Sequence, residues 1–397
     1  MVQFSKRVPA DGTDAVGAIL AAAADPSVIS FAGGLPAPEL FPVAEMKKAV
    51  DTVFDEHGRE AMQYGASRGV TELRELITKR VKEREGIDSK VENVMVTTGS
   101  EQVLDLVGKA FIDEGDEVLV EDPTYLCALD VYRSYGAKFV SVPQDEQGLR
   151  VDALEEALKN HPKAKLLYTV SNFQNPTGKT MPVDRRKKVA ELAAKYDVMV
   201  LEDNPYGDIR FEGEHVPAIK AFDTTDHVLY MSTFSKILAP GFRLGWVLGD
   251  PKVIDKLTVL KQSTDLHTDQ LAQWAVVEFF AQNDINKHVD QISALYGKRK
   301  DLMIEGMKKY FPEGVKYTNP EGGMFLWVKV PGVTDTVELF KKCLKEKVAF
   351  VPGDPFFAGK PEPGTFRLNY SNMQEDKIEE GLKRLGKALS DAVNENK

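Results

Sequence analysis

The hydrophobic residues of this chain fall into short apolar runs separated by longer stretches with helical spacing. Between residues 94 and 231 six such runs occur, each followed by a turn-like or helix-like stretch. Short β-branched runs that alternate with helices are typical of a mostly parallel sheet covered on both faces. We therefore predict strands at Val94–Thr97, Glu117–Val120, Lys138–Val142, Lys165–Val170, Val198–Leu201 and Val228–Met231.

A seventh run, Leu244–Leu248, follows its predecessor too closely for a helical crossover, so an antiparallel strand is expected there. After residue 284 the pattern changes. A long helical stretch over residues 285–310 precedes three further runs and a final charged helix over about 374–394. These runs, Met324–Val328, Val348–Val351 and Thr365–Asn369, indicate a smaller α+β domain.

The chain is therefore expected to divide into three parts. Residues 1–45 form an N-terminal segment that packs with the small domain, and residues 46–284 form a large domain. Residues 285–397 form the small C-terminal domain. The predicted fold class is α/β, with a mostly parallel sheet of about seven strands in the large domain.

Composition narrows the class of protein. The net charge of −10 argues against a nucleic-acid partner, and no apolar run approaches the ~18 residues of a membrane span. Cys127 and Cys343 are the two cysteines and the six histidines lack ligand spacing, so neither a disulfide framework nor a metal site is expected. Asp11 and Asp14 follow the basic start in place of an apolar region, which argues against a signal peptide. We expect a cytoplasmic enzyme.

Polar residues gather directly after the predicted strands. The carboxyl ends of parallel strands meet at one edge of a sheet, where open α/β sheets bind ligands. These segments should therefore converge on one site: Gly99–Ser100, Asp122–Tyr125, Asn175–Gly178, Asp203–Tyr206 and Ser235–Lys236.

The stretch from Ser232 to Trp246 carries the sharpest chemical signal. Lys236 lies just past a predicted strand, among hydroxyl side chains, with Arg243 seven positions further on. Hydroxyls and a guanidinium suit a phosphate dianion. A lysine beside a bound phosphate suits a Schiff base with pyridoxal 5′-phosphate (PLP). The alternative is a surface lysine in a polar loop.

These motifs together resemble the fold-type I PLP-dependent aminotransferases, and most closely the group that contains the 2-aminoadipate and kynurenine aminotransferases. The resemblance covers nearly the whole chain and implies the PLP-dependent transferase fold. It rests on Ile29–Pro36, Gln63–Gly65, Thr98–Ser100, Asp122–Tyr125, Asn175–Gly178, Asp203–Tyr206, Ser235–Lys236 and Phe366–Leu368.

The resemblance implies roles around the cofactor ring. Lys236 would form the Schiff base and then serve as the base that moves the substrate α-proton. Asp203 would pair with the pyridine nitrogen, and Tyr125 would lie against the ring. Asn175 and Tyr206 would donate hydrogen bonds to the phenolic oxygen.

The resemblance also implies a phosphate site and a substrate site. Arg367 would bind the substrate α-carboxylate with Asn175 nearby, and Gly34 would let the N-terminal segment pass close to the substrate. Tyr64 would reach the phosphate of the neighbouring subunit, which implies a homodimer. Glu101 departs from the glutamine that relatives often carry, so only its backbone N–H should serve the phosphate. The expected phosphate ligands are Gly99, Ser100, Glu101, Thr233, Ser235 and Arg243, beside Tyr64.

Three functions fit this pattern. The first is an aminotransferase that moves the amino group of an L-amino acid to a 2-oxo acid, with 2-oxoglutarate as the expected acceptor. The second is another PLP reaction on the same scaffold, such as elimination, decarboxylation or racemisation. The third is a PLP-sensing regulatory domain, which the acidic charge and the early start of the pattern disfavour.

The amino donor is less well defined. Relatives that act on 2-aminoadipate can supply an arginine from the N-terminal segment, whereas the corresponding position here is Gly17, with Lys6 and Arg7 well upstream. Aromatic or aliphatic donors are therefore expected, with 2-aminoadipate as an alternative. Arg7 is a candidate for the distal carboxylate of the acceptor.

Overall fold

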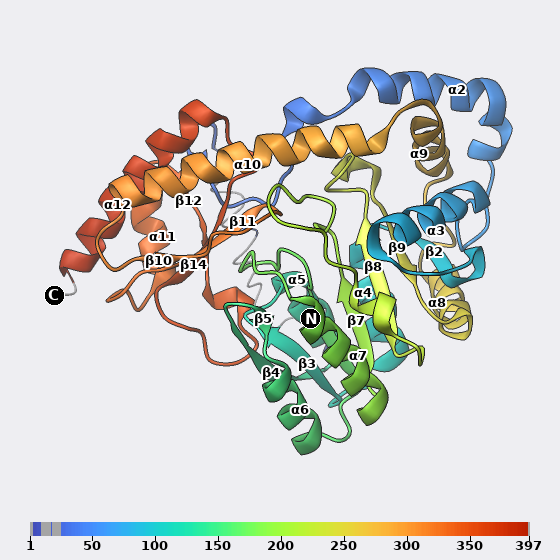
Figure 1. The fold of residues 1–397 in the computed structure, drawn as a ribbon, viewed down its shortest axis with the longest axis horizontal. Helices are drawn as coiled ribbons and strands as arrows, with labels where there is room; N and C mark the ends of the chain where they lie inside the picture. The colour runs from blue at the N-terminus through green and yellow to red at the C-terminus, as the bar shows by residue number, and fades with distance from the viewer. Residues whose placement is uncertain (1–2, 9–16, 18–24, 396–397) are drawn as a thin grey trace.

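A computed structural model describes residues 3–8, 17 and 25–395. Its centre is an eight-stranded mixed sheet in the order β2-β9-β8-β7-β6-β3-β4-β5 (Figure 1). The strands are β2 Val94–Thr98, β3 Glu117–Asp122, β4 Lys138–Asp145, β5 Gly148–Leu149, β6 Leu166–Thr169, β7 Met199–Asp203, β8 Val228–Thr233 and β9 Leu244–Leu248.

The sheet agrees with the sequence prediction in most respects. The central pairs between β8 and β4 are parallel, and β9 is antiparallel to both β8 and β2, as its short connection predicts. The sheet has eight strands instead of the predicted seven, because the two-residue β5 folds back on β4 as an antiparallel edge. Strands β6 and β8 are buried along their whole length, which explains why their sequences are continuous apolar runs.

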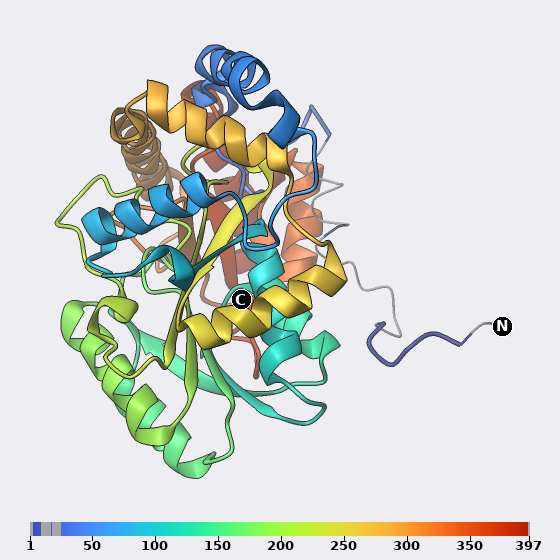
Figure 2. The same ribbon diagram turned by 90° about the vertical axis from the view of Figure 1, so that its right-hand side faces the viewer.

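Helices cover both faces of this sheet, with α6 and α7 on one side and α4, α5 and α8 on the other (Figure 2). Capping residues fix several helix ends: Asp250 accepts the N–H of Lys252 at the start of α8, and left-handed Gly86 ends α3. The helices of this part are α2 Val43–Ala61, α3 Thr71–Glu85, α4 Ser100–Phe111, α5 Leu126–Ser134, α6 Val151–Asn160, α7 Val183–Tyr196, α8 Pro251–Thr264 and α9 Gln270–Gln282.

A second, antiparallel sheet lies in the C-terminal part, in the order β10-β11-β14-β13. Beside it, β1 (Ile29–Ser30) pairs in parallel with β12, so the N-terminal segment adds a strand to this part of the molecule. The elements are α10 Ile285–Tyr310, β10 Lys316–Tyr317, β11 Phe325–Lys329, α11 Thr336–Lys345, β12 Val348–Ala349, β13 Val351–Pro352, β14 Thr365–Asn369 and α12 Glu375–Glu395. Short 3₁₀ turns are η1 Pro38–Leu40, η2 Val91–Asn93, η3 Ile219–Phe222, η4 Pro240–Phe242 and η5 Asp354–Phe356.

One strand prediction was wrong in detail. The run Val348–Val351 is divided at Phe350, because its first half pairs with β1 and its second half with β14. The proposed boundary at residue 285 coincides with the start of α10 and separates the two main sheets. Within the segment before residue 45, β1 pairs with β12, and residues 1–2, 9–16 and 18–24 lie outside the described part.

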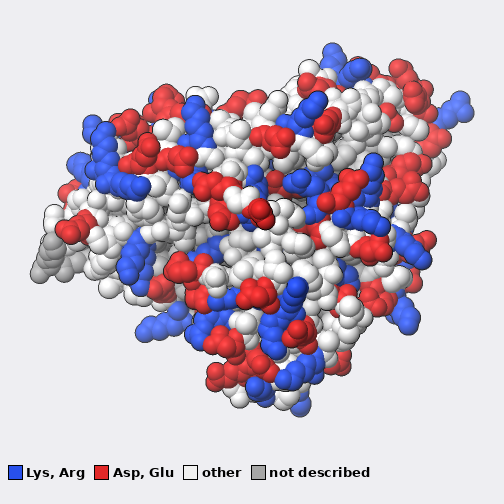
Figure 3. Space-filling view, in the orientation of Figure 1, with Lys and Arg blue, Asp and Glu red and all other residues white. Residues whose placement is uncertain are grey.

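The surface gives limited information about partners. On the face shown in Figure 3, the described lysine and arginine side chains are interspersed with acidic ones instead of gathering in one patch. Among the described residues, no helix is both long and apolar enough to cross a membrane.

Candidate active site

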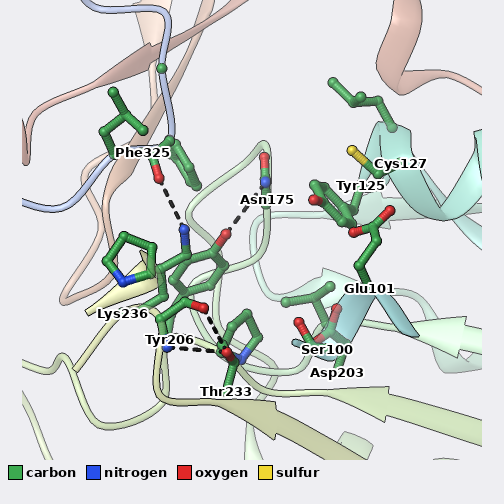
Figure 4. Close-up of a pocket in the computed structure, with 18 of the residues that line it drawn as sticks. Ser100, Glu101, Tyr125, Cys127, Asn175, Asp203, Tyr206, Thr233, Lys236 and Phe325 are labelled. Atoms are coloured by element: carbon green, nitrogen blue, oxygen red, sulfur yellow. Dashed lines mark hydrogen bonds between the residues drawn. The ribbon is translucent and has the colours of Figure 1, made fainter. Parts of the chain in front are cut away.

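A cavity of about 320 Å³ lies where the carboxyl ends of the large-sheet strands face the C-terminal part. Its walls come from both parts of the chain and from the N-terminal segment at Gly34 (Figure 4). Twelve of the predicted site residues line it: Gly34, Ser100, Glu101, Tyr125, Asn175, Asp203, Tyr206, Thr233, Ser235, Lys236, Arg243 and Arg367.

Lys236 occupies the centre of this cavity. The residue follows β8, and its Nζ donates a hydrogen bond to the carbonyl oxygen of Gly34 at 2.9 Å. Burial and the nearby guanidinium groups of Arg367 and Arg243 lower the pKa of the Lys236 amine to about 8. A large fraction of this amine is therefore neutral near pH 8, as a nucleophile or a base requires.

Asp203 ends strand β7 and is 4% exposed. Its Oδ2 accepts a hydrogen bond from the Tyr168 hydroxyl at 2.7 Å, whereas its Oδ1 has no hydrogen-bond partner among the described residues. Burial raises the pKa of the Asp203 carboxyl to about 7, with the Tyr168 hydrogen bond opposing the shift. A buried carboxylate with an open oxygen is suited to a cationic partner from outside the chain.

The N-terminus of α4 lies beside the guanidinium group of Arg243. Gly99 has φ of +72° and precedes the helix, and a Cβ at this position would collide with the guanidinium group of Arg243. Glycine therefore lets a cation lie directly beside the unpaired amides of the first helical turn. This combination of guanidinium and helix N-terminus favours an anion.

Two hydroxyl groups complete this end of the cavity. The Thr233 Oγ1 lies 2.9 Å from Ser235 Oγ and accepts the backbone N–H of Ser235 at 3.1 Å. It also lies 2.8 Å from the carbonyl oxygen of Leu244, so its proton has an internal acceptor. The Thr233 hydroxyl thus stabilises the turn at residues 233–235, and the Ser235 hydroxyl is better placed to form a hydrogen bond with a ligand.

The side chain of Glu101 lines the cavity near Tyr125 (Figure 4). Burial raises the pKa of the Glu101 carboxyl, and the nearby Arg243 lowers it in part. The partly buried Tyr125 lies beside it, and burial also raises the pKa of the Tyr125 phenol.

Arg367 is 6% exposed and is positioned by β14, opposite Trp327 of β11. Its Nη1 donates to Asn175 Oδ1 at 2.8 Å and its Nη2 donates to the carbonyl oxygen of Ala32 at 2.8 Å. The Asn175 amide nitrogen lies 3.4 Å from the Tyr206 hydroxyl. The Nε of Arg367 has no partner among the described residues, so the guanidinium retains a free donor for a ligand carboxylate.

Four residues discussed from the sequence lie apart from the cavity. Tyr64 is 79% exposed and makes an edge contact with the ring of His267, with centroids 5.8 Å apart. The guanidinium of Arg7 lies 5.8 Å from the centroid of the Tyr135 ring, and Lys6 forms an ion pair with a surface glutamate. Gly17 does not line the cavity either.

Sequence reasoning missed several lining residues. Tyr168 lies inside the apolar run of β6, where nothing in the pattern marks its hydroxyl as the partner of Asp203. Phe325 and Val351 belong to the C-terminal part and reach the cavity only through the folding of that part onto the large sheet. Leu126 and Cys127 directly follow Tyr125, and this adjacency was the available signal for them.

The residues present fit PLP. The open Asp203 Oδ1 suits a protonated ring nitrogen, and the helix N-terminus with Arg243 and Ser235 suits a phosphate. A lysine of lowered pKa lies between these two features.

Comparison with known proteins identifies the family. The family model for aminotransferase class I and II matches residues 28–385. Aromatic-amino-acid aminotransferase 1 of Thermococcus litoralis is 44% identical over 370 residues, which cover 92% of this chain and 89% of the relative.

Two solved structures are also similar. One is kynurenine aminotransferase of Pyrococcus horikoshii, solved in complex with PMP, kynurenine and its product. It is 42% identical and has a TM-score of 0.94, and the match covers 98% of this chain and 97% of that chain. The α-aminoadipate aminotransferase LysN of Thermus thermophilus, in complex with N-(5′-phosphopyridoxyl)-L-leucine, has a TM-score of 0.91 and 36% identity over 98% of each chain. The chain therefore belongs to the class I and II aminotransferases and is a PLP-dependent aminotransferase of fold type I.

Proposed function

We propose that this aminotransferase moves the amino group of an aromatic or aliphatic L-amino acid to a 2-oxo acid, with 2-oxoglutarate as acceptor. The observation that carries the donor class is the apolar part of the cavity lining, here called the apolar wall. It consists of Leu35, Leu126, Cys127, Phe325 and Val351. The ring centroid of Phe325 lies 4.2 Å from the guanidinium carbon of Arg367. An apolar side chain is stabilised there by burial, at ~25 cal/mol per Å² of apolar surface.

The charges in the cavity support the same donor class. Among the described lining residues the cations are Lys236, Arg243 and Arg367. We assign the first to the cofactor, the second to its phosphate and the third to the α-carboxylate, which leaves none for a second carboxylate. Residues 9–24 contain no lysine, arginine or histidine. We infer that the distal carboxylate of 2-oxoglutarate is met by a cation of the partner subunit.

The relatives' names support a range of donors. The Thermococcus litoralis relative is named for aromatic amino acids, and the Thermus thermophilus structure holds a leucine adduct. A third structure, from Thermococcus profundus, is described as a multiple substrate aminotransferase. We propose the corresponding breadth for this chain.

When bound, PLP supplies an electrophilic carbon for the substrate amine and an electron sink for the α-carbon. We assign Lys236 to covalent attachment and, once displaced, to removal of the substrate α-proton at its neutral Nζ. The Gly34 carbonyl oxygen accepts a hydrogen bond from Lys236 Nζ at 2.9 Å and would keep the free amine within the cavity. Asp203 would keep the ring nitrogen protonated, and Tyr125 would pack against the ring.

The remaining residues bind and orient. We assign Arg367 to the substrate α-carboxylate, because its planar fork matches a carboxylate and two of its nitrogens are already fixed by Asn175 and Ala32. Asn175 and Tyr206 would donate to the phenolic oxygen of the cofactor. The phosphate would be held by Gly99, Ser100, Glu101 through its backbone, Thr233, Ser235 and Arg243.

Absorption spectroscopy of the holoenzyme tests the donor class. Single L-amino acids are added to the PLP form, and loss of the visible band is measured together with the 2-oxo acid formed. We expect phenylalanine, tyrosine and leucine to convert the cofactor, and 2-oxoglutarate to restore the band more effectively than pyruvate. Conversion by 2-aminoadipate or glutamate alone would exclude the apolar donor class.

We further propose a homodimer in which Tyr64 completes the phosphate site of the partner subunit. Its exposure supports this, as does that of the neighbouring Met62, which is 80% exposed. A hybrid of Lys236→Ala and Tyr64→Ala subunits tests it. If Tyr64 acts across the interface, the hybrid has one intact site and recovers about half of wild-type activity per dimer. If it acts within its own subunit, both sites of the hybrid are defective.

A further inference from the structure

A fully buried polar pair lies behind the cavity without lining it. Glu121 is in β3 and Gln174 precedes the turn that carries Asn175, and both side chains are 1% exposed. The Gln174 Nε2 donates to Glu121 Oε2 at 3.2 Å. Glu121 also accepts the Thr169 hydroxyl at 2.7 Å and the backbone N–H of Val170 at 3.2 Å, so β6 anchors it.

Gln174 links two turns that belong to different strands. Its Nε2 also donates to the carbonyl oxygen of Pro123 at 2.8 Å, in the turn 122–125. Its Oε1 accepts the backbone N–H and the hydroxyl of Thr177, at 2.9 and 2.7 Å, in the turn 175–178. One amide side chain thus binds the turn before Tyr125 and the turn after Asn175.

These contacts continue to the substrate end of the cavity. The Asn175 Oδ1 accepts Arg367 Nη1 at 2.8 Å, so a movement of the turn 175–178 changes the orientation of the guanidinium group. Tyr125 stands at the first residue before α5 and takes its place from the turn 122–125.

We propose that Glu121 and Gln174 are a positioning pair: their hydrogen bonds hold the turns 122–125 and 175–178 together and thereby orient Arg367 toward the substrate carboxylate. The inference rests on the roles proposed above for Asn175 and Arg367. Neither member of the pair touches the cavity, so the pair acts only through the residues that do.

A charge exchange tests the pair in the holoenzyme. Gln174→Glu places two buried carboxyls within hydrogen-bond distance of each other, where they repel once both are ionised, and it removes the hydrogen bond that Gln174 donates to the Pro123 carbonyl. Glu121→Gln keeps the shape, and the Thr169 hydroxyl can turn to accept from the new amide. The double variant E121Q/Q174E again has one carboxyl facing one amide.

Four quantities are measured for each variant: kcat, KM for the amino acid, the pH midpoint of the visible cofactor band, and the thermal midpoint. We expect Q174E to raise KM roughly tenfold and to move the band midpoint, and E121Q to stay within roughly twofold. The double variant should recover the part of the loss that comes from the facing carboxyls, since its glutamate at 174 still cannot donate to the Pro123 carbonyl. Glu202→Gln is the matched control. Glu202 is equally buried and accepts from Ser171, Ile219 and Lys220, outside both turns.

Three results would overturn the proposal. They are a Q174E enzyme with wild-type KM and band midpoint, a double variant no better than Q174E, and an equal effect from E202Q. If Q174E does not fold, Gln174→Leu is measured in the same way, since Gln144 still donates to the Pro123 carbonyl at 2.5 Å. Asn175→Ala distinguishes a failure of the role assigned to Asn175 from a failure of the role assigned to the pair. If Asn175→Ala changes neither KM nor the band midpoint, the role assigned to Asn175 is wrong. If Asn175→Ala changes them and Q174E does not, only the role assigned to the pair is wrong.

Discussion

Replacing Asp203 by asparagine should stabilise the apoprotein while removing the carboxyl that we propose pairs with the cofactor ring. Asp203 is buried with one oxygen unpaired, and burial raises the pKa of its carboxyl from 3.8 to about 7. The unfolded chain therefore releases this proton at lower pH than the folded chain does. The free energy of unfolding then falls as the pH rises from ~4 to ~7, and the loss is complete above pH ~7.

The size of the effect follows from the two pKa values. Each pH unit between them corresponds to ~1.4 kcal/mol, so the ionised carboxyl costs up to about 4 kcal/mol of stability at pH 8. An asparagine has no charge to bury, and its side-chain oxygen can still accept the Tyr168 hydroxyl. Asp203→Asn should therefore raise the free energy of unfolding at pH 8 by a few kcal/mol and leave it nearly unchanged at pH 4.

Urea unfolding of the apoprotein between pH 4 and pH 8, at fixed protomer concentration, measures this difference. Asp208→Asn provides a control of opposite sign. The Asp208 carboxylate contacts Arg80 and Arg84, which lower its pKa, so its neutral replacement should destabilise the protein at pH 8. A D203N apoprotein less stable than wild type at pH 8, or one with the same dependence on pH, would refute the reasoning.

Three further predictions concern the cofactor and the substrate. Lys236→Ala should fold and bind PLP non-covalently yet lose transamination by several orders of magnitude. In the wild-type apoprotein, the rate of covalent attachment of added PLP should increase with pH up to a plateau above pH ~8, and stopped-flow absorbance measures this rate. A plateau near the ordinary lysine pKa of 10.5 would contradict the lowered value. Arg367→Lys should raise KM for the amino acid roughly tenfold to a hundredfold and leave the cofactor spectrum intact, because the variant loses a charge-assisted hydrogen bond worth about 1.5–3 kcal/mol. Loss of the visible cofactor band in this variant would instead indicate a structural role for Arg367. Glu101→Gln should tighten PLP binding, and the gain should grow with pH, because the wild-type carboxyl ionises and then repels the phosphate beside it. Equal affinities of the wild type and the variant for PLP at every pH would exclude this repulsion.

Much of the fold was predictable because its signals are local. The runs in the large sheet are continuous and apolar, since both faces are buried, and the helix at 285–310 has the predicted ends. The divided run at Phe350 was not predictable. Which half pairs with which strand depends on Ile29, over three hundred residues earlier in the chain.

The same distinction applies to the site. Lys236, Asp203 and Asn175 each follow a strand in a recognisable motif, and the structure brings them to one cavity. The Tyr168 hydroxyl and the Phe325 ring could not be assigned, because a residue inside a strand or in a distant sheet reaches the cavity only through tertiary packing.

The hydrogen bond between Lys236 and the Gly34 carbonyl bears on how this enzyme could change its substrates in evolution or by engineering. Leu35, which lines the apolar wall, directly follows the residue whose backbone holds the amine, so a substitution there also risks disturbing the base. Gly34 itself allows little change, since an added Cβ would lie 3.2 Å from the Phe325 ring. Val351 and Leu126 line the same wall from other elements and have no such bond to the lysine. Variation at these two positions offers a route to new donors that leaves the proton-transferring group in place.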